Sequence, residues 1–247
     1  MPRKETKIMN NWEFALEKDG EKHFQTVDLP HDWAITAPFS REMAEGEAQG
    51  FRDRWGVGWY RKIQVLEEKK SSYRYYLYFG GIYEDSTVWV NDKVVGGRKY
   101  GYSPFRLDIT DFVHTGDNEI LVRVDNTKKP ADRWYSGAGI YRTVKWIEME
   151  ERHLEENQVI IKTSLKGKVG IIEVNPGIEG IVRVTVRGGD ETYSCKGGKW
   201  PLTLWIPDAK RWSAKEPNLY ELTLELMDGE RSTDRITQKV GIREFSF

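Results

Sequence analysis

Cysteine and long apolar runs are almost missing from this sequence. Its 247 residues include one cysteine, Cys195, which excludes an intrachain disulfide. No run approaches the roughly 18 apolar residues of a membrane span. The polar start of the chain also lacks an apolar stretch of signal-peptide length. We therefore expect a cytoplasmic protein with no membrane partner.

Neither sign of charge dominates the chain. Lys and Arg total 38 against 39 Asp and Glu, giving a net charge of -1, and the two signs are mixed along the sequence. Nucleic-acid binding needs a concentrated basic face, so a nucleic-acid partner is not expected. The four histidines and the one cysteine do not form a cluster with metal-ligand spacing, so neither a metal site nor a cofactor is expected.

A long amphipathic helix is also missing, and the dominant period is two. Segments that are rich in β-branched or aromatic residues predict strands at 75–79, 86–90, 119–124, 180–186 and 220–226. Turn residues separate strand-like runs at Asn91-Asp92, Gly188-Gly189-Asp190 and Asp228-Gly229. Short strands at regular spacing predict an all-β fold made of β-sandwiches.

A change of composition near residues 147–153 predicts a domain boundary. Residues 1–147 hold most of the aromatics and the long loops, whereas the charged stretch from Glu148 to His153 leads into shorter, plainer strands. We predict a larger jelly-roll-like sandwich over 1–147, followed by an immunoglobulin-like sandwich over 148–247.

Aromatic residues are unusually frequent. Ten Trp, twelve Tyr and nine Phe make up 13% of the chain. Large rings fill sandwich cores well, but they also stack on the apolar faces of sugars, and the total does not choose between these interpretations. The strand-like context of four tryptophans predicts that they are core residues: Trp89, Trp146, Trp205 and Trp212.

Several segments occur in an order that resembles a known family. Asp28–Ile35 contains the letters LPHDW, Gly58–Lys62 contains WYR, and Arg133–Arg142 reads RWYSGAGIYR. Trp212-Ser213 and Gly241-Ile242-Arg243 follow in the second half. Together they are similar to glycoside hydrolase family 2, which includes β-galactosidases, β-glucuronidases and β-mannosidases.

The resemblance implies a sugar-binding jelly roll, then an immunoglobulin-like sandwich, then a (β/α)₈ barrel that carries the chemistry. Retaining glycosidases use two carboxyl groups about 5–5.5 Å apart, placed in a barrel at the strand ends. This chain stops at Phe247, where the barrel should begin. We expect no catalytic residue here and interpret Glu84-Asp85 as solvated turn charges.

The resemblance also implies partners for the chain. A C-terminal catalytic barrel in the full-length protein and a β-galactoside-type sugar, weakly bound without that barrel, are the first two. A homo-oligomer is a third, because such domains often contribute to oligomer contacts. Family members use sodium or magnesium ions, but no residue here can be assigned to them.

The loop before Gly139 holds the main site candidates. In the family an acid here reaches toward the sugar pocket, where a carboxylate can accept hydrogen bonds from two hydroxyls. Asp132 is the natural match, but the spacing to the glycine is one residue longer than usual and places Arg133 at the matching count. Trp134 and Tyr135 either line the pocket or pack the loop on its own domain. The loop around Arg54 is a candidate second wall.

The segment His31-Asp32-Trp33 is interpreted as structural. We expect a buried Trp33 that anchors a loop, while the His31 and Asp32 side chains satisfy nearby backbone groups.

The LPHDW form favours β-galactosidase among the family's activities. The chain is therefore expected to contribute one wall of the sugar site of a retaining β-galactosidase, without its cleavage machinery. The same portion of a β-glucuronidase, a free-standing carbohydrate-binding protein and an assembly module are the alternatives.

Overall fold

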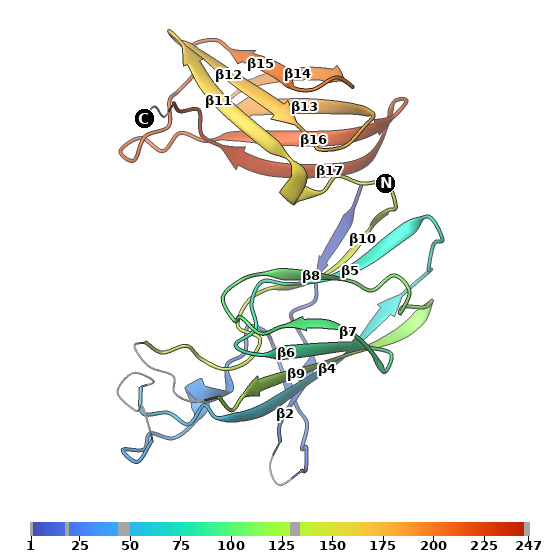
Figure 1. Cartoon of the computed structure of the whole chain (residues 1–247), viewed down its shortest axis with the longest axis vertical. Coiled ribbons are helices and arrows are strands. Elements are labelled where there is room, and N and C mark those ends of the chain that lie inside the picture. The colour runs from blue at the N-terminus through green and yellow to red at the C-terminus, as the bar shows by residue number, and fades with distance from the viewer. Residues whose placement is uncertain (1, 18–19, 44–49, 129–133, 245–247) are drawn as a thin grey trace. The chain divides into compact units, whose positions relative to one another are not determined.

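Two compact units make up the protein (Figure 1). The computed structural model describes residues 2–17, 20–43, 50–128 and 134–244. One unit is Glu5–Glu148, and the other combines Met1–Lys4 with Met149–Phe247. Each contains two sheets and its own core, which confirms the prediction of all-β sandwiches. The finer name jelly roll stays a prediction.

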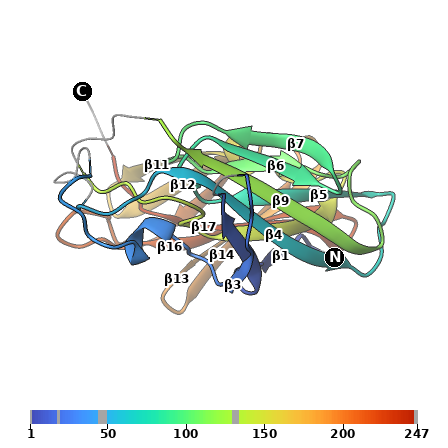
Figure 2. The same ribbon diagram turned by 90° about the horizontal axis from the view of Figure 1, so that it is seen from below.

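The unit Glu5–Glu148 is built from a six-stranded sheet of order β3-β2-β4-β9-β6-β7 and a four-stranded sheet of order β1-β10-β5-β8. Figure 2 shows β4, β9, β6 and β7 side by side in that order. The strands are β1 (Lys4–Lys7), β2 (Trp12–Leu16), β3 (Gln25–Val27), β4 (Gly56–Leu66), β5 (Tyr73–Phe79), β6 (Ser86–Val90), β7 (Lys93–Arg98), β8 (Phe105–Asp108), β9 (Gly116–Asn126) and β10 (Val144–Glu150).

Alternation along the strands places the core of this unit between its two sheets. In β9, Ile120, Val122 and Val124 are fully buried, while the residues between them are half-exposed. Trp12 and Tyr75 meet this core from the two different sheets. Burying a large apolar side chain stabilises a fold by about 1.5–3 kcal/mol, so the alternation fixes which face of each strand points inward.

The other unit pairs a three-stranded sheet of order β11-β12-β15 with a four-stranded sheet of order β14-β13-β16-β17. Val182, Val184 and Val186 of β13 face the same core as Leu222 and Leu224 of β16. The strands are β11 (Ile160–Lys166), β12 (Val169–Asn175), β13 (Ile181–Gly188), β14 (Glu191–Gly197), β15 (Leu202–Ile206), β16 (Tyr220–Asp228) and β17 (Arg231–Val240).

Helical structure is confined, among the described residues, to two 3₁₀ turns. They are η1 (Trp33–Thr36) and η2 (Glu156–Gln158). No helix in the described part of the chain has the length and apolar character to cross a bilayer.

Tight hairpins join neighbouring strands at the predicted turns. Asn91 and Asp92 connect β6 to β7 with φ of +48° and +63°. Positive φ at both central residues suits the right-handed twist of an antiparallel pair. The β13–β14 and β16–β17 hairpins turn at Gly189 and Gly229, as predicted.

The prediction that four tryptophans are core residues is only partly right. Trp146 is 1% exposed and lies in the core of its unit. Trp205 is 54% exposed, because Leu204 and Ile206 on either side of it point inward. Trp89 likewise lies on the outward-facing side of β6 and is half-buried. Strand context predicted the strands but not the face on which each ring lies.

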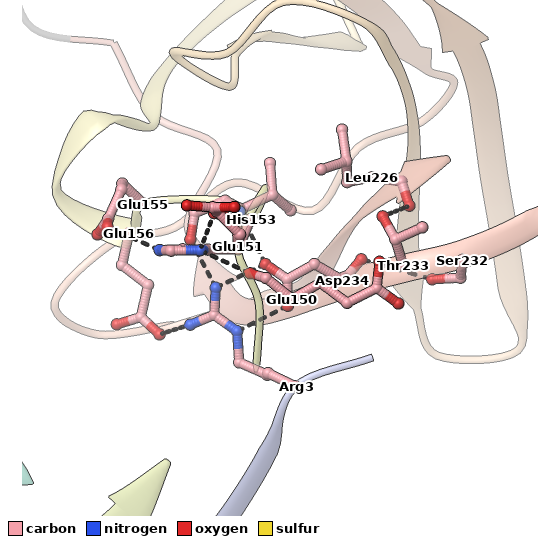
Figure 3. Close-up of polar contacts among 11 residues, drawn as sticks. Arg3, Glu150, Glu151, His153, Glu155, Glu156, Leu226, Ser232, Thr233 and Asp234 are labelled. Carbon is pink, nitrogen blue, oxygen red and sulfur yellow. Dashed lines mark hydrogen bonds and ion pairs between the residues drawn. The ribbon is translucent and has the colours of Figure 1, made fainter. Parts of the chain in front are cut away.

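The start of the chain is anchored on the unit that holds residues 149–247. Arg3 donates two hydrogen bonds to the carboxylate of Asp234, at 2.9 and 2.8 Å, and a third to the carbonyl of Leu154 at 2.6 Å. Figure 3 shows Arg3 pointing at this group and at Glu156. Asp234 is fully buried, so Arg3 supplies the charge that compensates it.

Candidate functional site

A polar and aromatic cluster in the unit Glu5–Glu148 forms where residues 134–140 run beside η1. The amide of Trp33 donates to the carbonyl of Ala138 at 3.1 Å. On the other side, Tyr83 and Gly139 exchange backbone hydrogen bonds of 2.9 and 2.7 Å. The segment is therefore fixed along both edges by backbone contacts. We call residues 134–140 the site loop.

Asp32 connects η1 to the site loop. One of its carboxylate oxygens accepts from the amides of Ala34, at 3.0 Å, and Ala138, at 2.9 Å. The other accepts from the Tyr135 hydroxyl at 2.6 Å. Burial, and then the bond to Asp32, raise the pKa of Tyr135, so it stays a neutral donor at ordinary pH. The structural interpretation of Asp32 is confirmed.

Two glycines allow this close approach. Gly137 has φ of +69°, and a Cβ there would come within 2.8 Å of the Asp32 carboxylate. Gly139 has φ of +120°, and a Cβ there would come within 2.2 Å of the Tyr60 hydroxyl. Both the backbone conformation and the lack of space require glycine at these positions.

The neighbours of Asp32 in the LPHDW segment have different partners. Trp33 is buried and its indole N–H donates to the carbonyl of Arg54 at 3.1 Å, which confirms its anchoring role. The His31 ring does not serve a backbone group as predicted. Its Nδ1 lies 2.7 Å from the hydroxyl of Tyr60, and burial lowers the pKa of His31.

Arg54 supports the site loop from the buried side. Its guanidinium donates to Ser136 Oγ at 2.7 Å and to Asn126 Oδ1 at 2.6 Å. The ring of Tyr83 lies 5.2 Å from the same guanidinium. Arg54 is 1% exposed, so it offers almost no surface to a sugar within this unit. Its direct sugar contact stays a prediction, and its observed bonds position the loop.

Exposed rings form the outer part of the cluster. Trp134 is 57% exposed and Tyr135 is 40% exposed. The indole N–H of Trp134 donates to the Tyr102 hydroxyl at 2.8 Å, and the Tyr102 ring meets Tyr83 edge-on at 5.2 Å. The rings are therefore tied to the unit but keep open surface. Asp132 and Arg133, the candidate acid and its alternative, lie outside the described residues.

Glu84 and Asp85 differ from the solvated turn charges that were predicted. Asp85 forms an ion pair with Lys128 at 2.7 Å. Glu84 is half-buried, and burial raises the pKa of its carboxyl despite the opposing charges of Arg54 and Lys128. Glu84 is therefore a partly desolvated carboxyl within reach of the Arg54 charge.

Sequence reasoning missed Asn126, Ser136 and Tyr102 as parts of this cluster. Asn126 occupies an inward position in the alternation of β9 and is fully buried. A polar residue at an inward position was a usable signal, because buried amides need partners. Ser136 and Tyr102 carried no comparable signal. Within the described ranges, no group of three or more His, Cys, Asp or Glu residues could hold a metal ion.

Each unit is a β-sandwich, and the unit Glu5–Glu148 carries the site loop. Residues 6–149 match the sugar binding domain of glycosyl hydrolases family 2, and residues 147–243 match the family's next domain, described as glycosyl hydrolases family 2. The chain belongs to glycosyl hydrolase family 2.

Curated relatives carry two kinds of name. A Formosa agariphila protein, provisionally named a beta-glucuronidase, is 32% identical over 98% of this chain, which covers 25% of that protein. Beta-galactosidase BoGH2A of Bacteroides ovatus is 30% identical over 99% of this chain, which covers 32% of it. The chain therefore spans a quarter to a third of the length of these relatives.

Solved structures agree with the family. A glycosyl hydrolase family 2 member from Bacteroides cellulosilyticus superposes with a TM-score of 0.83 at 27% identity, over 98% of this chain and 36% of that one. The chain thus corresponds to the β-sandwich portion of larger family 2 enzymes.

Proposed function

We propose that the site loop contributes one wall of the sugar site of a retaining β-galactosidase. Trp134 and Tyr135 present rings and a hydroxyl at the surface, while Asp32 and Arg54 hold the loop from beneath. The observation that carries the proposal is the Asp32 carboxylate, which binds both the loop backbone and Tyr135. Pre-organising a loop in this way lowers the cost of ligand binding.

The chemistry is assigned to a separate catalytic barrel in the full-length protein. The first curated relatives are three to four times as long as the matching region, which leaves room for such a domain in them. Asp132 or Arg133 would supply the charged contact to the sugar hydroxyls. A sugar site shared with a barrel is incomplete here, so millimolar affinity is the expected range for this chain.

Titration with methyl β-galactoside, followed by NMR at the Trp134 indole N–H, tests the proposal. A saturable shift that is lost in the Tyr135→Ala variant is the expected result. No saturable change at Trp134 would contradict a sugar-facing loop.

β-Glucuronide is the second candidate, because curated relatives include proteins named beta-glucuronidase. A parallel titration with methyl β-glucuronide compares the two. Tighter binding of the glucuronide at Trp134 would favour this alternative over the galactoside.

A further inference from the structure

A pocket of about 330 Å³ lies on the outer face of the six-stranded sheet, away from the residues of the site loop. It spans β4, β9 and β6, which are adjacent in the sheet (Figure 2). Its volume falls at the lower end of the range for small-molecule sites. It is lined by Lys22, Trp59, Trp89, Asp92, Glu119 and Leu121. We call it the outer pocket.

Two outward-facing tryptophans give the outer pocket its apolar surface. Trp59 of β4 and Trp89 of β6 have ring centroids 5.9 Å apart and an interplanar angle of 29°. Leu121 of β9, the strand between them, pairs with Trp89 in the ladder. The Trp59 ring is fixed by its indole N–H, which donates to the Glu17 carboxylate at 2.7 Å. Adjacent large rings on the solvent side of a sheet indicate a binding surface more than a packing requirement.

Charged groups complete the outer pocket, and Asn91 helps to position two of them, Asp92 and Glu119. Asp92 lies in the β6–β7 turn beside Asn91. The Asn91 side chain donates through Nδ2 to Asn118 Oδ1 at 2.9 Å, and its Oδ1 accepts from the backbone amide of Glu119 at 3.0 Å. The carboxylates of Asp92 and Glu119 are acceptors. Lys22 places its ammonium 3.7 Å from the centroid of the Trp59 ring and is a donor.

We propose that the outer pocket binds a neutral pyranose, as a second sugar site of this unit. A pyranose has an apolar C–H face that can pack against Trp89 and Leu121, because the Lys22 ammonium lies over the Trp59 ring. Its hydroxyls can donate to Asp92 and Glu119 and accept from Lys22. A purely apolar partner would desolvate these charges without hydrogen bonds, which is costly. Two carboxylates against one ammonium disfavour an anionic sugar.

Sugar binding at the outer pocket and sugar binding at the site loop can be measured separately in one titration. Lactose is added to the whole chain, and NMR follows the indole N–H resonances of Trp59, Trp89 and Trp134. Saturable shifts at Trp59 and Trp89 are the expected result, with methyl β-glucuronide binding at least tenfold more weakly. If Trp134 does not shift while the other two do, the site-loop proposal fails and the outer pocket stands.

Three variants decide whether the shifts come from the outer pocket. Trp89→Ala should weaken lactose binding at least tenfold, and Asp92→Asn, which suits the positive φ of this turn, should weaken it severalfold. Trp205→Ala removes an outward-facing strand ring of the other unit and should leave the titration unchanged. Equal weakening by Trp205→Ala, no shift at Trp59 and Trp89, or glucuronide binding as tight as lactose binding would overturn the proposal.

Discussion

At the scale of single residues, Asp32 is the group on which the geometry of the site loop depends. Its carboxylate accepts from two amides and one phenol, which come from η1 and the loop. Hydrogen bonds to a charged acceptor contribute about 1.5–3 kcal/mol each. Removal of the Asp32 carboxylate should therefore favour local opening of the site loop more than unfolding of the whole unit.

Asp32→Ala should therefore expose the Ala138 amide to solvent. Loss of a bond to a charged acceptor predicts roughly tenfold or greater acceleration of hydrogen exchange at this amide. Asp32→Asn keeps an amide oxygen in place of the accepting Oδ1 and should restore part of the protection. Unchanged exchange at Ala138 in Asp32→Ala would show that the loop does not depend on this side chain.

Gly137→Ala should combine backbone strain with a clash. The new Cβ takes a left-handed φ and meets the Asp32 carboxylate, so a loss of about 1–3 kcal/mol in unfolding free energy is expected. Gly20→Ala is the matched control, because its φ is +81° and nothing lies within 4 Å of its Cβ. Urea unfolding compares the two. Equal losses of unfolding free energy in the two variants would show that backbone strain, and not the clash with Asp32, causes the effect.

At the scale of elements, the first residues of the chain contribute to the stability of the unit that holds residues 149–247. Arg3 is the partner of a fully buried carboxylate, and breaking a buried pair costs about 3–5 kcal/mol. Arg3→Ala should lower the stability of this unit by that amount. Arg231→Ala is the control, because its pair with Glu150 is exposed and contributes at most about 1 kcal/mol.

The same pair predicts a pH dependence. Burial alone would raise the pKa of Asp234, but the bonds and charge of Arg3 and the amide of Leu154 lower it overall. A lowered folded-state pKa gives stability that is complete above the unfolded value of about 3.9 and is lost as pH falls through the folded value. Urea unfolding near pH 3 should therefore show less difference between Arg3→Ala and the parent chain than at pH 7. An equal difference at both pH values would contradict this.

The positions of the strands were more predictable from the sequence than the sheet face on which a side chain lies or its long-range contacts. Period-two alternation and turn residues predicted β5, β6, β9, β13 and β16. They did not predict that Trp205 points outward. Alternation shows that successive side chains point to opposite faces, but not which of the two faces is buried. Nor did they predict the bond from Asp32 to Ala138, which joins residues 106 positions apart. Such contacts depend on how loops meet, and a single sequence has no local signal for that.

At the scale of the whole molecule, the chain consists of two sandwiches of glycosyl hydrolase family 2, and the first of them carries the site loop. The Trp134 and Tyr135 rings of this loop are exposed, whereas Arg54, which supports it, is buried. We propose that this chain shapes a sugar site but does not cleave the glycosidic bond. Hydrolysis of an aryl β-galactoside by the purified 247-residue chain tests it most directly. No turnover above the uncatalysed rate is expected, and turnover that rises with protein concentration would contradict the proposal.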